Sequence, residues 1–132
     1  MDLIKILTIC GLIYLGASSI SCIHHAPPSD EDKQRLVNMG ILKSIRVSID
    51  VYQSNGSKLP NKNTDLHDYF KDRTSGTLFE YSDGKKFLDA WGSPLLFETD
   101  GDEITRIRSL GPNKVIELNG GDDMVIEVHT QK

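Results

Sequence analysis

Apolar residues recur at helical spacing over one long stretch of the chain. Steps of four, four, four and three residues separate the members of a single stripe, namely Val37, Ile41, Ile45, Ile49 and Tyr52. Ser29 or Asp30 is expected to begin this helix, because either side chain can accept hydrogen bonds from the free N–H groups of the first turn. Asn55 and Gly56 are expected to end it, and Pro60 prevents its continuation. The pattern predicts a long helix whose stripe packs in the core.

The chain after this helix changes to short elements with alternating apolar residues. Asn63, Thr64 and Asp65 offer a cap for a short helix or turn. Asp100-Gly101-Asp102 is typical of a hairpin turn between two strands. The predicted strands cover residues 78–81, 94–99, 104–110 and 124–128. One long N-terminal helix packed on a small antiparallel sheet is therefore predicted, which is an α+β fold.

The first 22 residues have a different character. Ile6 to Ile20 is an apolar run of about fifteen residues, which is short for crossing about 30 Å of hydrocarbon. Residues 1–21 are predicted to be a signal peptide for export. Ser19-Ile20-Ser21-Cys22 resembles a bacterial lipobox, in which the cysteine is lipidated. The alternatives are soluble secretion after cleavage, or an uncleaved anchor.

The rest of the chain divides into two parts. Residues 22–30, which include two prolines, are predicted to be a tether, and residues 31–132 are predicted to be the globular domain.

Composition limits the classes of function. The 132 residues are 38% apolar and 26% charged, which suits one soluble domain. A formal net charge of −4 argues against a nucleic-acid partner, since such a partner favours a basic surface. Cys10 lies inside the signal peptide, so Cys22 would remain alone and cannot form an internal disulfide. No arrangement of a nucleophile and a base stands out, and we expect no enzymatic activity.

The segment from Gly111 to Asp123, which we call the acidic loop, carries the candidate chemistry. A Gly-Pro turn precedes Asn113, and Gly120 and Gly121 let the chain fold back to bring Asp122 and Asp123 near it. Two adjacent carboxylates repel each other unless a positive charge lies between them. Oxygen ligands suit a hard cation such as calcium. Further candidate oxygens are those of Glu117 and Asn119 and the backbone carbonyl of Leu110. The alternative is a solvated turn without metal.

Three motifs together resemble one protein family. They are Asp89-Ala90-Trp91-Gly92-Ser93-Pro94, Ser109-Leu110-Gly111-Pro112-Asn113 and Gly120-Gly121-Asp122-Asp123. In this combination they resemble the C-terminal half of the type II secretion major pseudopilin. The resemblance implies a pseudopilin domain that binds calcium in its late loop.

By position, the resemblance also implies roles for individual residues. Asp122 and Asp123 match the family's acidic pair, and Leu110 matches a carbonyl donor. Asn113 stands where the family has an aspartate ligand, which implies weaker binding. Trp91 and Pro94 are expected to pack. The family's prepilin signature and its long apolar filament helix are absent from this sequence.

Two functions are therefore expected as alternatives. The first is a non-enzymatic exported protein that acts in envelope protein secretion and assembly, or in contacts with envelope proteins. The second is a stand-alone calcium-dependent binding lipoprotein unrelated to secretion. The expected partners are envelope or secretion-apparatus proteins, and a membrane reached through a lipid on Cys22.

Overall fold

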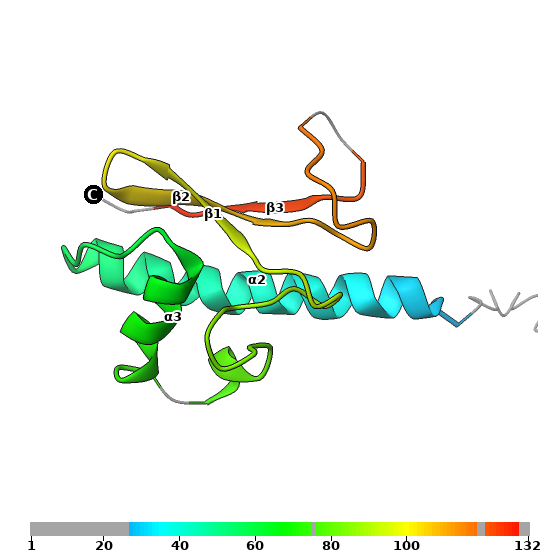
Figure 1. Cartoon of the computed structure of the whole chain (residues 1–132), viewed down its shortest axis with the longest axis horizontal. Coiled ribbons are helices and arrows are strands. Elements are labelled where there is room, and N and C mark those ends of the chain that lie inside the picture. The colour runs from blue at the N-terminus through cyan, green and yellow to red at the C-terminus, as the bar shows by residue number, and fades with distance from the viewer. Residues whose placement is uncertain (1–26, 75, 119–120, 130–132) are drawn as a thin grey trace, which may run out of the picture.

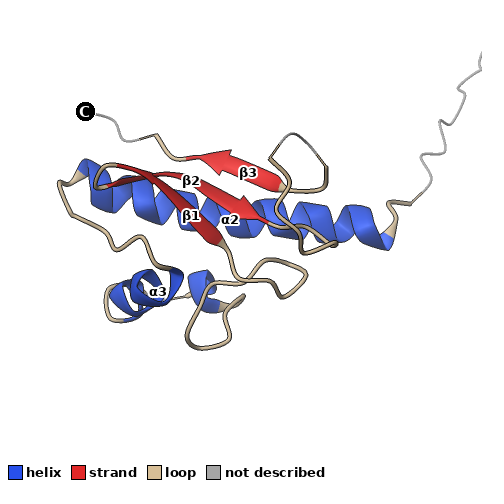
Figure 2. Cartoon of the chain, turned by 45° about the horizontal axis from the view of Figure 1, so that its top comes forward, coloured by secondary structure: helices blue, strands red, loops and turns tan. Residues whose placement is uncertain are grey.

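A computed structural model describes residues 27–74, 76–118 and 121–129. These residues form a long helix, α2 (Asp30–Ser54), a short helix, α3 (Asn63–Lys71), and the 3₁₀ turn η1 (Thr77–Phe79). Three strands follow: β1 (Leu96–Asp100), β2 (Glu103–Ser109) and β3 (Met124–Glu127). In Figure 1 the sheet lies above α2 and α3 lies below it, and in Figure 2 strands β1 and β2 pass in front of α2. All three pack around one core. The predicted α+β class is confirmed.

The predicted signal peptide and Cys22 lie outside the described residues, so their roles stay predictions. Within the described ranges, none of the helices combines the length and the apolar character needed to cross a bilayer.

Helix α2 begins and ends where the sequence predicts. The Ser29 hydroxyl accepts from the Asp32 N–H at 3.1 Å, and the Asp32 carboxylate accepts from the Ser29 N–H at 3.1 Å. This reciprocal pair satisfies two N–H groups at the start of the helix. Hydrogen bonds from the Ser29 hydroxyl and then from its N–H lower the pKa of Asp32. At the other end, Gly56 adopts a left-handed φ of 79°, which stops the helix after Ser54.

The buried face of α2 differs in part from the predicted stripe. Ile41, Ile45 and Ile49 are buried as predicted, but Val37 is 41% exposed. An α-helix has about 3.6 residues per turn, so each step of four residues turns about 40° past the starting face. Three such steps carry Val37 away from the face that holds Ile49. The buried face is completed by Leu42 and by the two amides Asn38 and Gln53.

The three strands form an antiparallel sheet in the order β1-β2-β3. Asp100 pairs with Glu103 across the predicted hairpin turn, which is confirmed. The register shifts between Glu98 and Thr99, where β2 contains one extra residue. This bulge explains why Ile104 and Ile107 are both fully buried although they are three residues apart, a spacing that would place them on opposite faces of a regular strand.

Two local predictions are wrong. Residues 78–81 do not form a strand, because Thr77–Phe79 is a 3₁₀ turn that packs Leu78 and Phe79 against the core. Asn63 does not cap α3, whose cap residue is Lys62. Instead, the Asn63 amide accepts from the Phe87 N–H at 2.7 Å and donates to the Leu95 carbonyl at 2.8 Å. In both places long-range contacts outweigh the local preference.

A buried amide joins the helix to the central strand. The Gln53 Oε1 accepts from the Ile104 N–H at 2.8 Å, and its Nε2 donates to the Ile104 carbonyl at 3.2 Å. A buried backbone group without a partner costs free energy, so this pair fixes β2 against one position of α2.

Replacing Gln53 by glutamate should therefore destabilise the fold. The Gln53→Glu carboxylate cannot donate to the Ile104 carbonyl and places a charge in a buried site, so we expect a loss of roughly 1–3 kcal/mol. Gln34→Glu makes the same chemical change at an exposed position of α2 and should stay within about 0.5 kcal/mol of the parent. Urea unfolding followed by circular dichroism measures both. Equal losses for the two variants would show that the amide bridge is not a stability determinant.

Candidate metal centre in the acidic loop

The acidic loop connects two neighbouring strands of the sheet. It leaves the end of β2 after Ser109 and returns at Met124, the first residue of β3. Ser109 pairs directly with Met124 across the sheet, so the two ends of the loop are held together. Figure 1 shows the loop in orange at the end of the sheet.

Three carboxylates of this loop come together. Glu117, Asp122 and Asp123 each offer one oxygen, and these oxygens lie within 4.8 Å of one another. Such a group could hold a metal ion, although the geometry does not specify calcium. The sequence predicted Asp122 and Asp123 as ligands and Glu117 as a further source of oxygen, so the convergence of these acids is confirmed. Asn119, another candidate source of oxygen, lies outside the described residues.

Hydrogen bonds inside the loop hold the three acids in place. The Glu117 N–H donates to Asp123 Oδ2 at 3.0 Å, and the Asp122 N–H donates to Glu117 Oε2 at 2.8 Å. The Asn113 N–H donates to Asp122 Oδ2 at 3.0 Å. Each carboxylate is thereby oriented by the backbone of another part of the loop, which is the kind of support that fixes a ligand set.

The remaining oxygens of the two aspartates have no partner. Asp122 Oδ1 and Asp123 Oδ1 are buried and accept no hydrogen bond from the described residues. The Asp123 side chain is only 3% exposed. A buried ionised carboxylate with an unused oxygen is costly unless a cation or donor compensates it. The two oxygens without partners are therefore the observation in this loop that indicates a bound cation or donor.

Arg108 supplies part of the compensating charge. Its guanidinium lies 3.0 Å from Asp123 Oδ2 and 2.8 Å from Glu98 Oε1. The hydrogen bond to Glu98 and then the one to Asp123 raise the pKa of Arg108, against the effect of burial. The sequence pattern did not single out this residue. Its place in β2, next to Ser109 at the start of the loop, is the one signal that could have suggested it.

Asp122 stays ionised for a local reason. The hydrogen bond from the Asn113 N–H lowers the pKa of Asp122, and burial opposes this effect only in part. The lowered pKa means that the native loop favours the charged carboxylate, so the stability it contributes is fully present above the unfolded-state pKa and is lost as the pH falls through the lowered value. At neutral pH the carboxylate is available to a cation.

The side chain of Asn113 is turned away from the acids. Its Oδ1 accepts from the Val115 N–H at 2.8 Å, and the residue is exposed. The structure thus brings the Asn113 backbone, rather than its amide, to Asp122. Leu110 is half-buried directly before the Gly-Pro turn. The ligand roles of the Asn113 amide and the Leu110 carbonyl stay predictions.

Gly111 allows a close approach between the Gly-Pro turn and Asp122. It has a φ of 67°, and a Cβ at this position would lie 2.5 Å from the Asp122 carbonyl oxygen and 2.8 Å from Asp122 Oδ2. Only glycine tolerates both the left-handed backbone and this contact. The Gly-Pro turn is therefore packed directly against one of the acids.

Buried Asp89 connects the acidic loop to the turn at residues 89–94. Its Oδ1 accepts from the Trp91 N–H at 3.0 Å and the Ser93 N–H at 2.8 Å. Its Oδ2 accepts from the Ser109 hydroxyl at 2.8 Å. Asp89 thus joins the first two motifs of the sequence resemblance, a role that the sequence alone did not reveal. Trp91 is half-buried, whereas Pro94 is exposed and does not have the expected packing role.

A second polar pair lies near α3. His67 Nε2 is 2.7 Å from the Ser82 hydroxyl, and His67 Nδ1 is 3.6 Å from Asp68. The spacing is that of a nucleophile and a base, but the Ser82 oxygen also accepts from the Gly84 N–H at 2.9 Å. The His67 ring is buried and packs against both Phe79 and Phe87, which also stack on each other. We interpret this pair as a support for the 82–87 turn.

Comparisons with known proteins give no relative. No family model, no curated protein and no solved structure matches this chain.

Alanine at Gly111 should lower the free energy of unfolding more than alanine at Gly84 does. Both glycines have a left-handed backbone, but only at Gly111 would an added Cβ have a neighbour within 4 Å. Both variants lose about 1–2 kcal/mol through backbone strain. Gly111→Ala must also displace Asp122, which should add roughly 1–3 kcal/mol. Thermal unfolding of the two variants measures the difference, and equal losses would contradict the close packing of Asp122 on this turn.

Proposed function

We propose that the acidic loop binds calcium and that the protein is a non-enzymatic, exported domain of pseudopilin type that acts through contacts with envelope proteins. The observation that carries the metal assignment is the pair of buried oxygens, Asp122 Oδ1 and Asp123 Oδ1, that accept no hydrogen bond from the described residues. Calcium would complete the coordination of both oxygens and balance the charge that Arg108 leaves uncompensated.

The donor set favours calcium over other metals. The converging side chains are all carboxylates, whereas zinc and other transition metals favour nitrogen and sulfur ligands. Calcium takes about six to eight oxygens in a flexible geometry, while magnesium requires a near-ideal octahedron. The missing ligands would come from water, from the Leu110 carbonyl and from the Asn113 amide, after this amide turns away from Val115.

The proposed role of the ion is structural. A cation held by Glu117, Asp122 and Asp123 would tie Glu117, in the middle of the loop, to the residues directly before β3. The resemblance to the type II secretion major pseudopilin supports this role, because the three motifs that carry it lie around the loop and the turn that Asp89 joins to it.

Export and lipidation at Cys22 are part of the same proposal. Labelled palmitate should follow the parent protein and Cys10→Ala, and should be lost from Cys22→Ala. Label retained by Cys22→Ala would contradict the lipidation of this cysteine.

A second candidate function rests on the apolar residues of the loop. Val115, Ile116 and Leu118 are all more than half exposed, and Leu118 is 81% exposed. They flank Glu117, so calcium would fix them in place. This arrangement favours a calcium-dependent binding lipoprotein unrelated to secretion. Recovery of an envelope or secretion-apparatus protein on the immobilised chain would favour the first function over this one.

Calcium should stabilise the protein through the acidic loop. At free calcium about 100-fold above its Kd, native-state binding adds about 2.7 kcal/mol to the free energy of unfolding. Thermal melts in calcium and in chelator measure this gain. Glu117→Gln removes one charged ligand and should reduce the gain, whereas Glu103→Gln, at another half-buried glutamate, should preserve it.

Two results would contradict the proposed metal site. One is a parent melt that is the same in calcium and in chelator. The other is an equal calcium gain in Glu117→Gln and in the parent, which would place any bound calcium elsewhere on the chain.

A further inference from the structure

The face of α2 opposite the core is apolar and lacks charge along its centre. Steps of four, four, three and four residues connect its members, namely Leu36, Gly40, Ser44, Val47 and Val51. Leu36 is 70% exposed, Val47 59% and Val51 52%. A surface helix normally places polar residues on this side. We call this set the outer stripe of α2.

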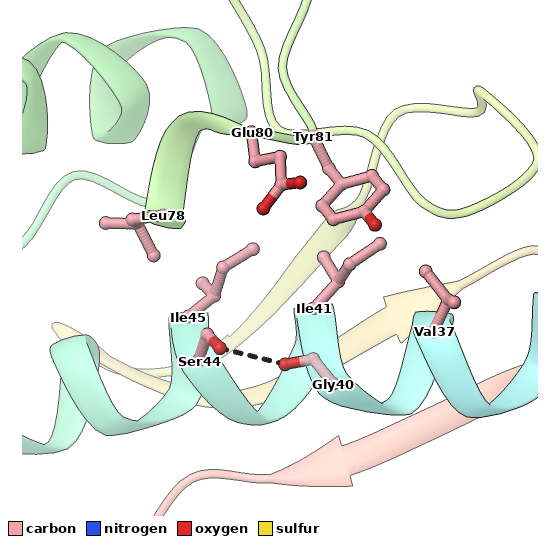
Figure 3. A pocket seen from close by; sticks show the side chains of 8 residues that line it. All are labelled: Val37, Gly40, Ile41, Ser44, Ile45, Leu78, Glu80 and Tyr81. Carbon is pink, nitrogen blue, oxygen red and sulfur yellow. Dashed lines mark hydrogen bonds between the residues drawn. The ribbon is translucent and has the colours of Figure 1, made fainter. Parts of the chain in front are cut away.

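A groove runs beside the outer stripe. It is lined by Val37, Gly40, Ile41, Ser44, Ile45, Leu78, Glu80 and Tyr81. Figure 3 shows the groove between α2 and the segment that follows η1, with Glu80 and Tyr81 above the helix. The Ser44 hydroxyl is satisfied by the Gly40 carbonyl at 2.9 Å, and the space beside the Gly40 Cα is open. The middle of the outer stripe therefore carries only small side chains, so the backbone of another helix can approach it closely.

Opposite charges border this surface on its two sides. On a helical projection with about 3.6 residues per turn, Lys43 lies on one side of the outer stripe, next to Leu36 and Val47. Glu80 lies on the other side, across the groove. Neither residue forms an ion pair within the described residues, whereas every other charged residue of α2 has an ion-pair partner or a cap bond.

We propose that the outer stripe and groove pair with the same surface of a second copy, with the two α2 helices parallel. In such a pair the two-fold axis runs parallel to the two helices. It brings the side of one helix that carries Lys43 against the side of the other subunit that carries Glu80. Lys43 of each copy then faces Glu80 of the partner subunit, at the same level along the helix. An antiparallel pair would instead place Lys43 against Lys43 and Glu80 against Glu80, which electrostatic repulsion disfavours.

The rest of the surface suits the same arrangement. Gly40 and Ser44 let the two backbones approach closely at the centre, and Leu36, Val47 and Val51 would remove exposed apolar area from water. A parallel pair also places the first turns of both α2 helices at one end. This agrees with the proposed attachment of both chains to one membrane through Cys22.

Charge exchange tests the proposal by sedimentation equilibrium of the purified full chain. The parent chain should form a dimer, and Lys43→Glu and Glu80→Lys should each weaken it by at least about tenfold, because like charges then meet twice. An equimolar mixture of the two single variants should restore the affinity, since the glutamate introduced at position 43 of one chain then meets the lysine introduced at position 80 of the other. Lys71→Glu, an exposed site on α3, should leave the affinity unchanged.

Three outcomes would overturn the proposal. The first is a parent chain that remains a monomer at every concentration. The second is a pair of single variants that dimerise as tightly as the parent, which places the contact elsewhere. The third is a mixture that does not regain affinity. Circular dichroism of each variant separates loss of the dimer from loss of the fold, and restoration by mixing cannot come from an ion pair within one chain.

Discussion

Burial of one face of α2 against a sheet of only three strands is the constraint on which the rest of the structure depends. Ile41, Ile45 and Ile49 cover the face of the sheet that carries Ile104 and Ile107. Apolar burial of this kind contributes about 25 cal/mol per Å² but has little directional preference. The position of β2 along α2 is set by Gln53, whose side-chain amide forms hydrogen bonds with both the N–H and the carbonyl of Ile104. Strand β2 is thereby held at one position along the helix.

The position of β2 determines where the acidic loop starts. Ser109 ends this strand, is fully buried and donates to Asp89, so both the strand end and the 89–94 turn are fixed at one point. Beyond this point the loop folds on its own polar groups, with the backbone of Glu117 on Asp123 and the backbone of Asn113 on Asp122. Arg108 balances one of the acids. The unused oxygens are a consequence of this packing, and a cation would complement them.

Sequence patterns predicted the parts of the molecule that depend on local residues, and missed those that depend on distant partners. The bounds of α2 follow from Ser29 and Gly56, and the hairpin follows from Asp100-Gly101-Asp102. By contrast, Asn63 bonds residues 24 and 32 positions away instead of capping α3. Arg108 and Asp89 have no unusual spacing, and only the packed sheet brings them to the loop. The Asn113 amide was expected at the metal, but the Val115 N–H competes for it.

A crystal structure determined at saturating calcium tests the metal centre most directly. We predict one ion about 2.3–2.6 Å from an oxygen of each of Glu117, Asp122 and Asp123. Arg108 should remain bonded to Asp123 Oδ2 in that structure. A loop that binds no ion under these conditions, with Asp122 Oδ1 and Asp123 Oδ1 bonded to water or to a basic side chain, would contradict the proposed metal centre.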